Sequence, residues 1–352
     1  MQFASDNWTG VAPQVMAAIA AEAARYGAAY GGSPLDKAVE ALFGDVFERD
    51  VAVFFVATGS AANALALASV SRPAGAVLCH ADSHIFEDEV GGVEFMADGA
   101  RVVPVGGALA KLDPAALGRA LAQFQPDPVR SGQPMAVSVT QQTEMGAVYG
   151  VDEIREIARI AKEHDLPLHM DGARFANAVV QSNASPAEMT WKAGVDMISF
   201  GGTKNGCIAA EALVFFDRRF AKDMPFLRKR SGHLFSKARF VAAQFDAYLR
   251  DGLWLGLARH ANRMADRLRA GLAAAPHARE AWPTGGNEVF AVLRRADAKR
   301  MREAGAAFHD WAQPRGGDPV ELAEDESLVR LVTAFSTQPE DVDAFLAALE
   351  RK

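Results

Sequence analysis

Short apolar runs alternate with segments of helical periodicity over the first two thirds of the chain, and small or polar residues follow each run. Repeated strand–helix alternation predicts a mostly parallel sheet with helices on both faces. The run at 51–57 is apolar throughout, which is typical of a parallel strand buried on both faces. We therefore expect an α/β fold with strands at 51–57, 76–80, 135–140, 166–170 and 195–200.

The pattern changes toward the C-terminus. A long helical stretch runs from about 237–274, and apolar runs at 287–293 and 328–335 indicate strands with short helices around them. With roughly 150 residues per domain as a guide, 352 residues are enough for two domains. We predict a large domain at 1–240 and a smaller C-terminal α+β domain at 241–352.

Two local features add to this outline. Pro126, Pro128 and Pro134 indicate a loop before the strand at 135–140. Arg330 lies inside an otherwise apolar run. A buried guanidinium needs an acidic partner, which either the protein or a ligand would supply.

Composition excludes several classes of function. Half of the residues are hydrophobic and the net charge is -7. An acidic chain does not suit nucleic acid or an anionic membrane, and no run of about 18 apolar residues indicates a membrane span. The N-terminus lacks the regions of a signal peptide, and Cys79 and Cys207 are too few for a disulfide framework. We therefore expect a cytoplasmic protein with a small-molecule ligand and without nucleic-acid or membrane partners.

The first predicted strand ends in Thr58-Gly59-Ser60, and a helix begins there. The free N–H groups of a first helical turn attract an anion, and the two hydroxyls add donors. The turn therefore suits a phosphate group. An ordinary helix N-cap without a ligand explains the same residues, so both interpretations stay open on this stretch alone.

Reactive side chains follow the later strands as well. His84 comes after the second strand with Glu89 five residues further on, and Gln142, Asp171 and Arg174 follow the next two. Ligands of such sheets bind beyond the carboxyl ends of the strands, so we expect these side chains at one edge. The alternative for His84 is a helix-start histidine whose ring is hydrogen-bonded within the fold. The alternative for the glutamate is a solvated first turn, where the helix dipole favours acidic residues.

Lys204 follows the strand at 195–200 within Gly201-Gly202-Thr203-Lys204-Asn205-Gly206. Glycines allow a sharp turn and close approach to a bound group. Burial lowers the pKa of a lysine, and the neutral amine forms a Schiff base with a carbonyl. An exposed turn lysine is the alternative, because glycine-rich turns are common.

Together these side chains suit pyridoxal phosphate. Lys204 would hold the cofactor's aldehyde as a Schiff base, and Thr58-Gly59-Ser60 would bind its phosphate. Asp171 would pair with the protonated pyridine nitrogen, which lets the ring accept electrons. His84 would lie flat on the ring, and an arginine would bind an amino acid's carboxylate as a fork. We assign no metal ligands.

Over nearly its whole length, the sequence resembles the threonine aldolase and β-eliminating lyase group of fold type I pyridoxal-phosphate enzymes. Within that group it is similar to the low-specificity L-threonine aldolases and L-phenylserine aldolases. The motifs that carry the resemblance are Ser5-Asp6-Asn7, Thr58-Gly59-Ser60-Ala61-Ala62-Asn63, Ser83-His84-Ile85 with Glu89 and Gly91-Gly92, His169-Met170-Asp171-Gly172-Ala173-Arg174, Ser199-Phe200-Gly201-Gly202-Thr203-Lys204-Asn205-Gly206 and Arg330-Leu331-Val332-Thr333.

The resemblance implies an aminotransferase-like fold and a carbon–carbon lyase. Such an aldolase cleaves β-hydroxy-α-amino acids, such as L-threonine, L-allo-threonine and L-phenylserine, to glycine and an aldehyde. Active sites of this fold type are usually built at a dimer interface, so we expect a homodimer or homotetramer. By that analogy Tyr30 and the segment Arg228–His233 reach a neighbour's site, although a solvated face explains the basic segment equally well.

Residue roles follow from the same resemblance. Lys204 corresponds to the cofactor lysine, Asp171 to the carboxylate on the ring nitrogen and His84 to the stacking histidine. The base that takes the β-hydroxyl proton is expected to be His84, or a water held by His84 and Glu89, because both follow one strand. The family's phosphate-binding turn corresponds to Gly59 and Ser60. The family's groups near the substrate carboxylate or the cofactor's ring oxygen correspond to Ser5, Arg174 and Arg330.

The sequence departs from the family at positions on the substrate's β-side, so the preferred aldehyde stays open. These positions are Gly32-Ser33-Pro34, Asp88 and the loop Thr140–Glu144. Two further functions stay open. One is a β-eliminating lyase or dehydratase on the same cofactor, which releases ammonia and a keto acid. The other is a catalytically silent metabolite-binding protein.

Overall fold

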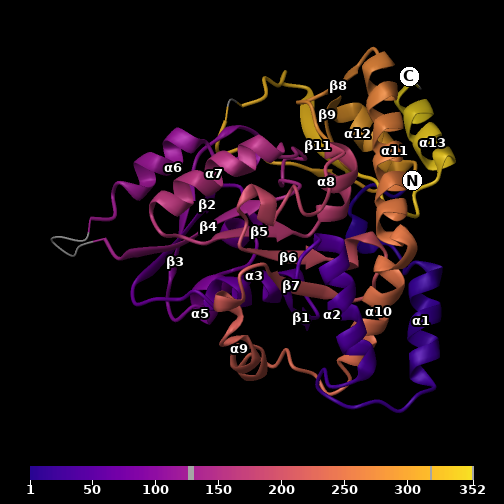
Figure 1. Cartoon of the computed structure of the whole chain (residues 1–352). Helices are drawn as coiled ribbons and strands as arrows, with labels where there is room; N and C mark the ends of the chain where they lie inside the picture. The colour runs from indigo at the N-terminus through magenta and orange to yellow at the C-terminus, as the bar shows by residue number, and fades with distance from the viewer. Residues whose placement is uncertain (126–130, 318, 351–352) are drawn as a thin grey trace.

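The computed structural model describes residues 1–125, 131–317 and 319–350 (Figure 1). The loop predicted around Pro126 and Pro128 lies outside the described residues. Seven strands form one sheet in the order β1-β7-β6-β5-β4-β2-β3. The pairs β6–β5, β5–β4, β4–β2 and β2–β3 are parallel, which confirms the predicted mostly parallel sheet. The strands are β1 Ala52–Val56, β2 Gly75–His80, β3 Arg101–Val105, β4 Gln133–Thr140, β5 Leu168–Gly172, β6 Met197–Gly201 and β7 Glu211–Phe215.

The prediction for β1 was wrong in one respect. This strand lies at an edge of the sheet and runs antiparallel to β7. Helices bury both of its faces: Phe55 packs against Phe43 and Phe245, whereas Val56 belongs to the core that contains Leu65. The apolar run therefore indicates a strand that is buried on both faces, and such burial does not depend on the direction of the strand.

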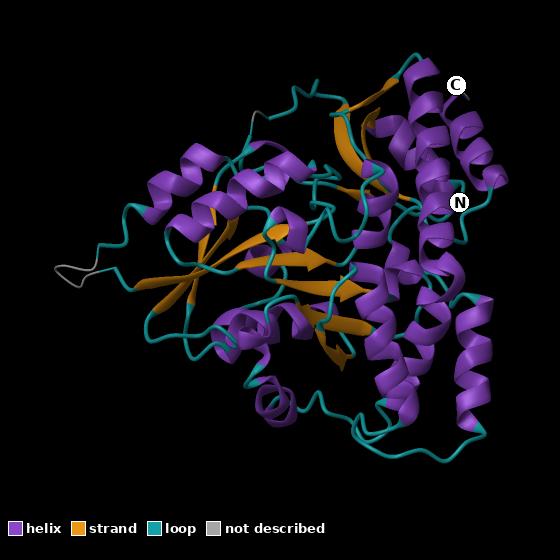
Figure 2. Ribbon diagram, in the orientation of Figure 1, coloured by secondary structure: helices purple, strands orange, loops and turns teal. Residues whose placement is uncertain are grey.

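Helices cover both faces of the sheet, as predicted (Figure 2). Along β6, Ile198 and Phe200 join one large core, and Met197 joins the core on the opposite face. The helices of this part are α1 Pro13–Ala23, α2 Pro34–Phe47, α3 Gly59–Ala68, α4 His84–Glu87, α5 Gly92–Met96, α6 Pro114–Leu121, α7 Val151–Glu163, α8 Phe175–Ser182, α9 Met224–Arg230 and α10 Arg239–Leu249.

A second, four-stranded antiparallel sheet has the order β10-β11-β9-β8. The N-terminal segment joins its core, where the ring centroid of Phe3 lies 5.1 Å from that of Phe345. Both chain ends consequently lie beside this part (Figure 1). Its elements are α11 Leu253–Ala274, β8 Ala278–Glu280, β9 Glu288–Arg294, α12 Arg295–Glu303, β10 His309–Asp310, β11 Glu326–Val332 and α13 Pro339–Glu350.

The long helical stretch predicted at about 237–274 is divided between α10 and α11. Asp251 and Gly252 between them have φ angles of 53° and 67°, in the left-handed region that an α-helix excludes. α10 packs against α1 and α2 of the larger part. The division of the chain into domains at residues 240 and 241 stays a prediction.

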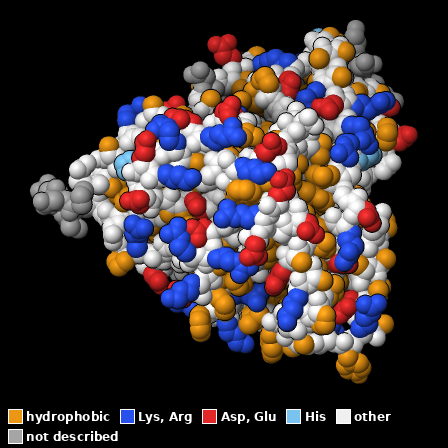
Figure 3. Space-filling view, in the orientation of Figure 1, with side chains coloured by type: hydrophobic (Ala, Val, Ile, Leu, Met, Phe, Trp, Pro, Cys, Tyr) orange, Lys and Arg blue, Asp and Glu red, His pale blue; other side chains and the backbone are white. Residues whose placement is uncertain are grey.

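The surface agrees with the mixed composition. Basic and acidic side chains are interspersed on the face that Figure 3 shows. Among the described residues, no helix is both long and apolar enough to cross a membrane.

Candidate active site

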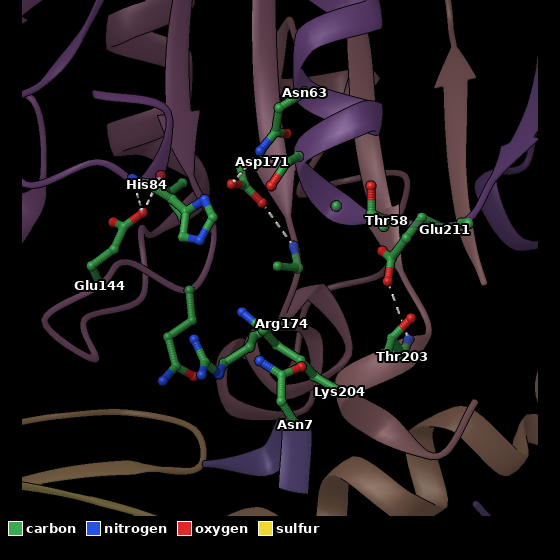
Figure 4. A pocket seen from close by; sticks show the side chains of 16 residues that line it. Asn7, Thr58, Asn63, His84, Glu144, Asp171, Arg174, Thr203, Lys204 and Glu211 are labelled. Atoms are coloured by element: carbon green, nitrogen blue, oxygen red, sulfur yellow. Dashed lines mark hydrogen bonds between the residues drawn. The ribbon is translucent and has the colours of Figure 1, made fainter. Parts of the chain in front are cut away.

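A cavity of about 280 Å³ lies at the carboxyl ends of the central strands (Figure 4). Parallel pairing aligns Thr140 of β4 with Asp171 of β5, and Asp171 with Ser199 of β6, so these strands end together. The first cavity is lined by Asn7, Ala57, Thr58, Gly59, Ser60, Asn63, His84, Thr140, Gln142, Glu144, Asp171, Ala173, Arg174, Thr203, Lys204 and Glu211.

A second cavity of about 450 Å³ adjoins the first. It extends toward the four-stranded sheet and includes Trp311 and Arg330. Residues from both parts of the molecule therefore surround one continuous site. The residues that line both cavities are Asn7, His84, Glu144, Arg174 and Lys204.

Lys204 lies in a short turn after β6 and faces both cavities, which excludes the interpretation as an exposed turn residue. The next residue anchors the turn: Asn205 donates to the hydroxyl of Tyr248 at 2.7 Å and to the carbonyl of Trp254 at 2.9 Å. Burial lowers the pKa of Lys204, and Arg174 lowers it further. A less basic amine is a better nucleophile toward a carbonyl at neutral pH.

Asp171 is fixed at the end of β5 by two donors. Its Oδ2 accepts from the Asn63 amide at 2.9 Å, and its Oδ1 accepts from the N–H of Ala173 at 3.0 Å. His169 lies behind it in the sheet between the hydroxyls of Ser138 and Ser199. Burial lowers the pKa of that imidazole to about 4, so it stays neutral. The carboxylate of Asp171 is thus oriented to meet a cationic group.

His84 begins α4 and borders the cavity, whereas Glu89 lies behind it. The Nδ1 atom of His84 lies 2.9 Å from Oε1 of Glu89, which also accepts from Asn63. The hydrogen bond to Glu89 raises the pKa of His84, and burial raises the pKa of Glu89. The glutamate does not line either cavity. It contacts the site through two residues that line it, His84 and Asn63.

Thr58-Gly59-Ser60 forms the N-terminus of α3 and the wall of the first cavity. The hydroxyl of Thr58 accepts from the N–H of Ala61 at 3.2 Å, so Thr58 is the N-cap of α3. The phosphate interpretation is compatible with it. Apart from its chain neighbours and the backbone of its own helix, no atom of the described residues lies within 4 Å of the position that a Cβ on Gly59 would take. A helix N-terminus beside open space fits a phosphate group.

Arg174 is fully paired by acidic side chains. Its Nε and Nη2 donate to the two carboxylate oxygens of Asp6 at 2.7 and 2.9 Å, and Nη1 lies 3.5 Å from Glu288. Burial would raise the pKa of Asp6, but Arg174 and Lys204 bring it below its ordinary value. The same carboxylates outweigh burial at Arg174 and raise its pKa.

Arg330 has the acidic partner that the sequence predicted, but a loosely placed one. Its Nη1 lies 3.6 Å from Glu288, and its Nε is buried without a hydrogen-bond partner among the described residues. The guanidinium lies 4.0 Å over the ring of Trp311. Burial lowers its pKa. Ser5, which accepts from the N–H of Asn7 at 3.1 Å, lines the same second cavity. The second cavity is thus lined by a guanidinium, that of Arg330, whose charge is only partly compensated by the protein.

The structure adds residues that we did not place in the site from sequence. Asn63, Glu211 and Glu288 are buried polar residues inside apolar segments. A buried amide needs hydrogen-bond partners and a buried carboxylate needs a cation or donors, so each of these residues indicates a polar partner, as Arg330 does. The family resemblance placed the loop of Glu144 on the substrate's β-side but did not single out this residue, because a carboxylate in a loop is usually solvated. Among the described residues, no group of histidine, cysteine and acidic side chains has the arrangement of a metal site.

The fold and the cavity define the class of this protein as a pyridoxal-phosphate enzyme of fold type I. The family model described as beta-eliminating lyase matches residues 2–296. The chain belongs to the beta-eliminating lyase family.

Relatives and solved structures agree with this assignment. A low specificity L-threonine aldolase from Pseudomonas aeruginosa is 40% identical over 88% of this chain and 89% of its own. A second one, from a Pseudomonas species, is 39% identical over the same shares. The structure of Leishmania major threonine aldolase matches with a TM-score of 0.91 and 28% identity over 99% of this chain and 98% of that one.

Proposed function

We propose that this protein is a pyridoxal-phosphate-dependent aldolase. It cleaves the Cα–Cβ bond of β-hydroxy-α-amino acids, such as L-threonine, L-allo-threonine and L-phenylserine, to glycine and an aldehyde. The observation that carries the proposal is the meeting of Lys204, Asp171 and His84 around one cavity with a helix N-terminus in its wall. The Pseudomonas aldolases, which align over most of the chain, support the reaction type.

The residues of the first cavity fit the cofactor group by group. When bound, pyridoxal phosphate accepts the electron pair released at Cα, which allows a Cα–Cβ bond to break. Lys204 would hold its aldehyde carbon, Asp171 would keep the ring nitrogen protonated, and His84 would pack on the ring. Thr58, Gly59 and Ser60 would hold the phosphate with hydroxyl and backbone N–H donors.

Arg330 binds the substrate's carboxylate. It lines the second cavity beside Ser5, and Glu288 compensates its charge only at 3.6 Å. A carboxylate offers the planar partner that a guanidinium prefers. Arg174 also lines both cavities but contributes only positive potential, because Asp6 already occupies its guanidinium. Glu89 keeps the imidazole of His84 in place, and His84 itself is one candidate for the proton acceptor.

The active protein is a homodimer or homotetramer in the cytoplasm with sites at the subunit interface. Phe226 on α9 is 74% exposed, and the neighbouring Lys229 lies 5.0 Å from the half-exposed ring of Tyr30. Large exposed apolar side chains often mark an interface. Sedimentation of the cofactor-loaded protein tests this proposal, and a monomer at micromolar concentration would contradict it.

Product analysis tests the reaction. The purified protein is incubated with pyridoxal phosphate and, separately, L-threonine, L-phenylserine or L-serine. We expect equal amounts of aldehyde and glycine from the first or second substrate and no product from Lys204→Ala. The alternative function is β-elimination, which the family's description as beta-eliminating lyase favours. Release of ammonia and a keto acid without glycine would show that the protein is such a lyase. A protein that binds no cofactor and gives no product would be a silent binding protein.

A further inference from the structure

Glu144 lies where the two cavities meet, and the function proposed above gives it no role. The cleaved bond joins the part of the substrate next to the cofactor to the part that extends away from it. We therefore expect this bond at the junction of the cavities, beside the residues that line both. The set is small enough to examine one residue at a time.

Few of these residues can accept a proton near neutral pH. An asparagine amide does not titrate in this range, and the guanidinium of Arg174 stays charged. Lys204 is assigned to the cofactor. The hydrogen bond to Glu89 raises the pKa of His84 and so favours its protonated form. Glu144 is the remaining group of the set.

The surroundings of Glu144 suit proton exchange. Its Oε1 accepts from the N–H of His84 at 2.7 Å and from the hydroxyl of Thr140 at 3.2 Å, which fixes the carboxyl group (Figure 4). Its Oε2 is buried and has no hydrogen-bond partner among the described residues. Burial and the nearby Asp171 raise the pKa of Glu144 to about 7. Such a group both takes and returns a proton at neutral pH.

We propose that Glu144 is the base that takes the proton from the substrate's β-hydroxyl. The O–H bond breaks and its proton moves to a carboxylate oxygen of Glu144. The electron pair left on oxygen forms the π bond of the aldehyde carbonyl, and the Cα–Cβ bond breaks. The electron pair of that bond is left at Cα, where the bound cofactor would stabilise it. Cα then takes up one proton to complete glycine, and Glu144 releases the proton that it accepted. His84 then keeps its role against the cofactor ring.

The test compares two reactions of the cofactor-loaded enzyme, because the inference rests on the proposed function. Cleavage of L-threonine needs the β-hydroxyl base. Exchange of a glycine α-proton for deuterium in D₂O uses the same cofactor and the same lysine but no hydroxyl. In Glu144→Gln, the amide oxygen can still accept from His84 and Thr140, so the substitution removes the titrating group and keeps the geometry.

We expect Glu144→Gln to lower kcat for cleavage by about 10²- to 10⁴-fold, the usual contribution of a general base. Glycine exchange and cofactor uptake should stay within about twofold of wild type, whereas His84→Asn should affect both reactions. Unchanged cleavage in Glu144→Gln would overturn the proposal. An equal loss of cleavage and exchange would also overturn it, because Glu144 would then act on the cofactor or the fold.

Glu163→Gln is the matched control. Glu163 lies at the exposed end of α7 and pairs with Arg159, so the same substitution there should change neither reaction. If Glu144→Gln does not fold, Glu144→Asp withdraws the carboxyl group by one methylene and should again reduce cleavage more than exchange. A wild-type enzyme that exchanges glycine protons but releases no aldehyde would contradict the proposed function itself.

Discussion

Two arginines face the same buried carboxylate of Glu288 but differ in their partners. Arg174 has a bidentate partner in Asp6, whereas the Nε of Arg330 has no hydrogen-bond partner in the part of the chain that the structure describes, and its guanidinium lies over Trp311. The difference predicts that one arginine supports the fold and the other binds substrate. Each expectation can be measured separately.

Arg330→Lys should mainly weaken substrate binding. A lysine keeps the charge but loses the fork that matches a carboxylate. We expect KM for L-threonine to rise by about 10- to 100-fold, since a charge-assisted hydrogen bond contributes about 1.5–3 kcal/mol. Steady-state kinetics with L-threonine measure this. An unchanged KM would remove Arg330 from the substrate site.

Arg174→Met should mainly destabilise the fold. Removing the cation takes the bidentate partner from the buried Asp6 and leaves Glu288 with Arg330 at 3.6 Å as its cation. Breaking a buried ion pair costs about 3–5 kcal/mol. Urea unfolding of the cofactor-free protein measures the loss. A variant that unfolds like wild type but has a raised KM would show that Arg174 binds the substrate directly.

Most of the site residues that the sequence predicts lie at the ends of strands. Lys204, Asp171 and His84 follow buried strands, so parallel pairing brings them together. The bond between Arg174 and Asp6 joins residues 168 positions apart, and no periodicity relates them. Glu144 was missed because its burial depends on how its loop folds over α4.

Among the elements, α3 supplies the phosphate site through its first turn. Gly59→Ala adds a methyl group that no described residue outside the adjoining helix backbone approaches within 4 Å, so the cofactor-free protein should unfold at the wild-type temperature or slightly above it. Affinity for pyridoxal phosphate should fall at least tenfold, because the methyl group takes space beside the helix N-terminus. Fluorescence titration with the cofactor measures this.

Gly118→Ala is the control for that substitution. Gly118 lies in α6, away from both cavities, and also has no atom within 4 Å of its added Cβ. It should leave cofactor affinity unchanged and stabilise the helix by about 0.5–1 kcal/mol. Equal cofactor affinity in the two variants would argue against a phosphate at α3.

The sequence predicted the existence of the main strands and helices better than their directions. The apolar run of β1 indicated a strand correctly. A strand with helices on both faces has this apolar pattern whether it runs parallel or antiparallel to its neighbour. The break between α10 and α11 depends on two backbone angles at Asp251 and Gly252, which alter the helical periodicity little. The direction of a strand and the position of a helix break are set by tertiary packing, which cannot be read from the local sequence.

Across the whole molecule, buried carboxylates make stability depend on pH. Burial raises the pKa of Glu211 from its ordinary value of 4.5 to about 7. The folded state therefore holds this proton more tightly than the unfolded state. The contribution to stability is complete below pH 4.5 and is lost as pH rises through 7.

Glu211→Gln should remove this pH dependence. Relative to the variant, the cofactor-free wild type should lose about 2.5 kcal/mol of unfolding free energy between pH 5 and pH 8. Urea unfolding across this range measures the difference. His169, with its pKa lowered to about 4, acts oppositely below pH 6.5 but contributes equally to both proteins. Parallel profiles for the two proteins would show that Glu211 is ionised in the fold.

The measurement that tests the central claim most directly is the position of the bound cofactor. Borohydride reduction fixes pyridoxal phosphate to the amine that holds it, and mass spectrometry of the peptides locates that amine. We predict one modified residue per chain, Lys204, and no stable modification in Lys204→Ala. Modification of another lysine, or of none at saturating cofactor, would contradict the assignment of this cavity as the catalytic site.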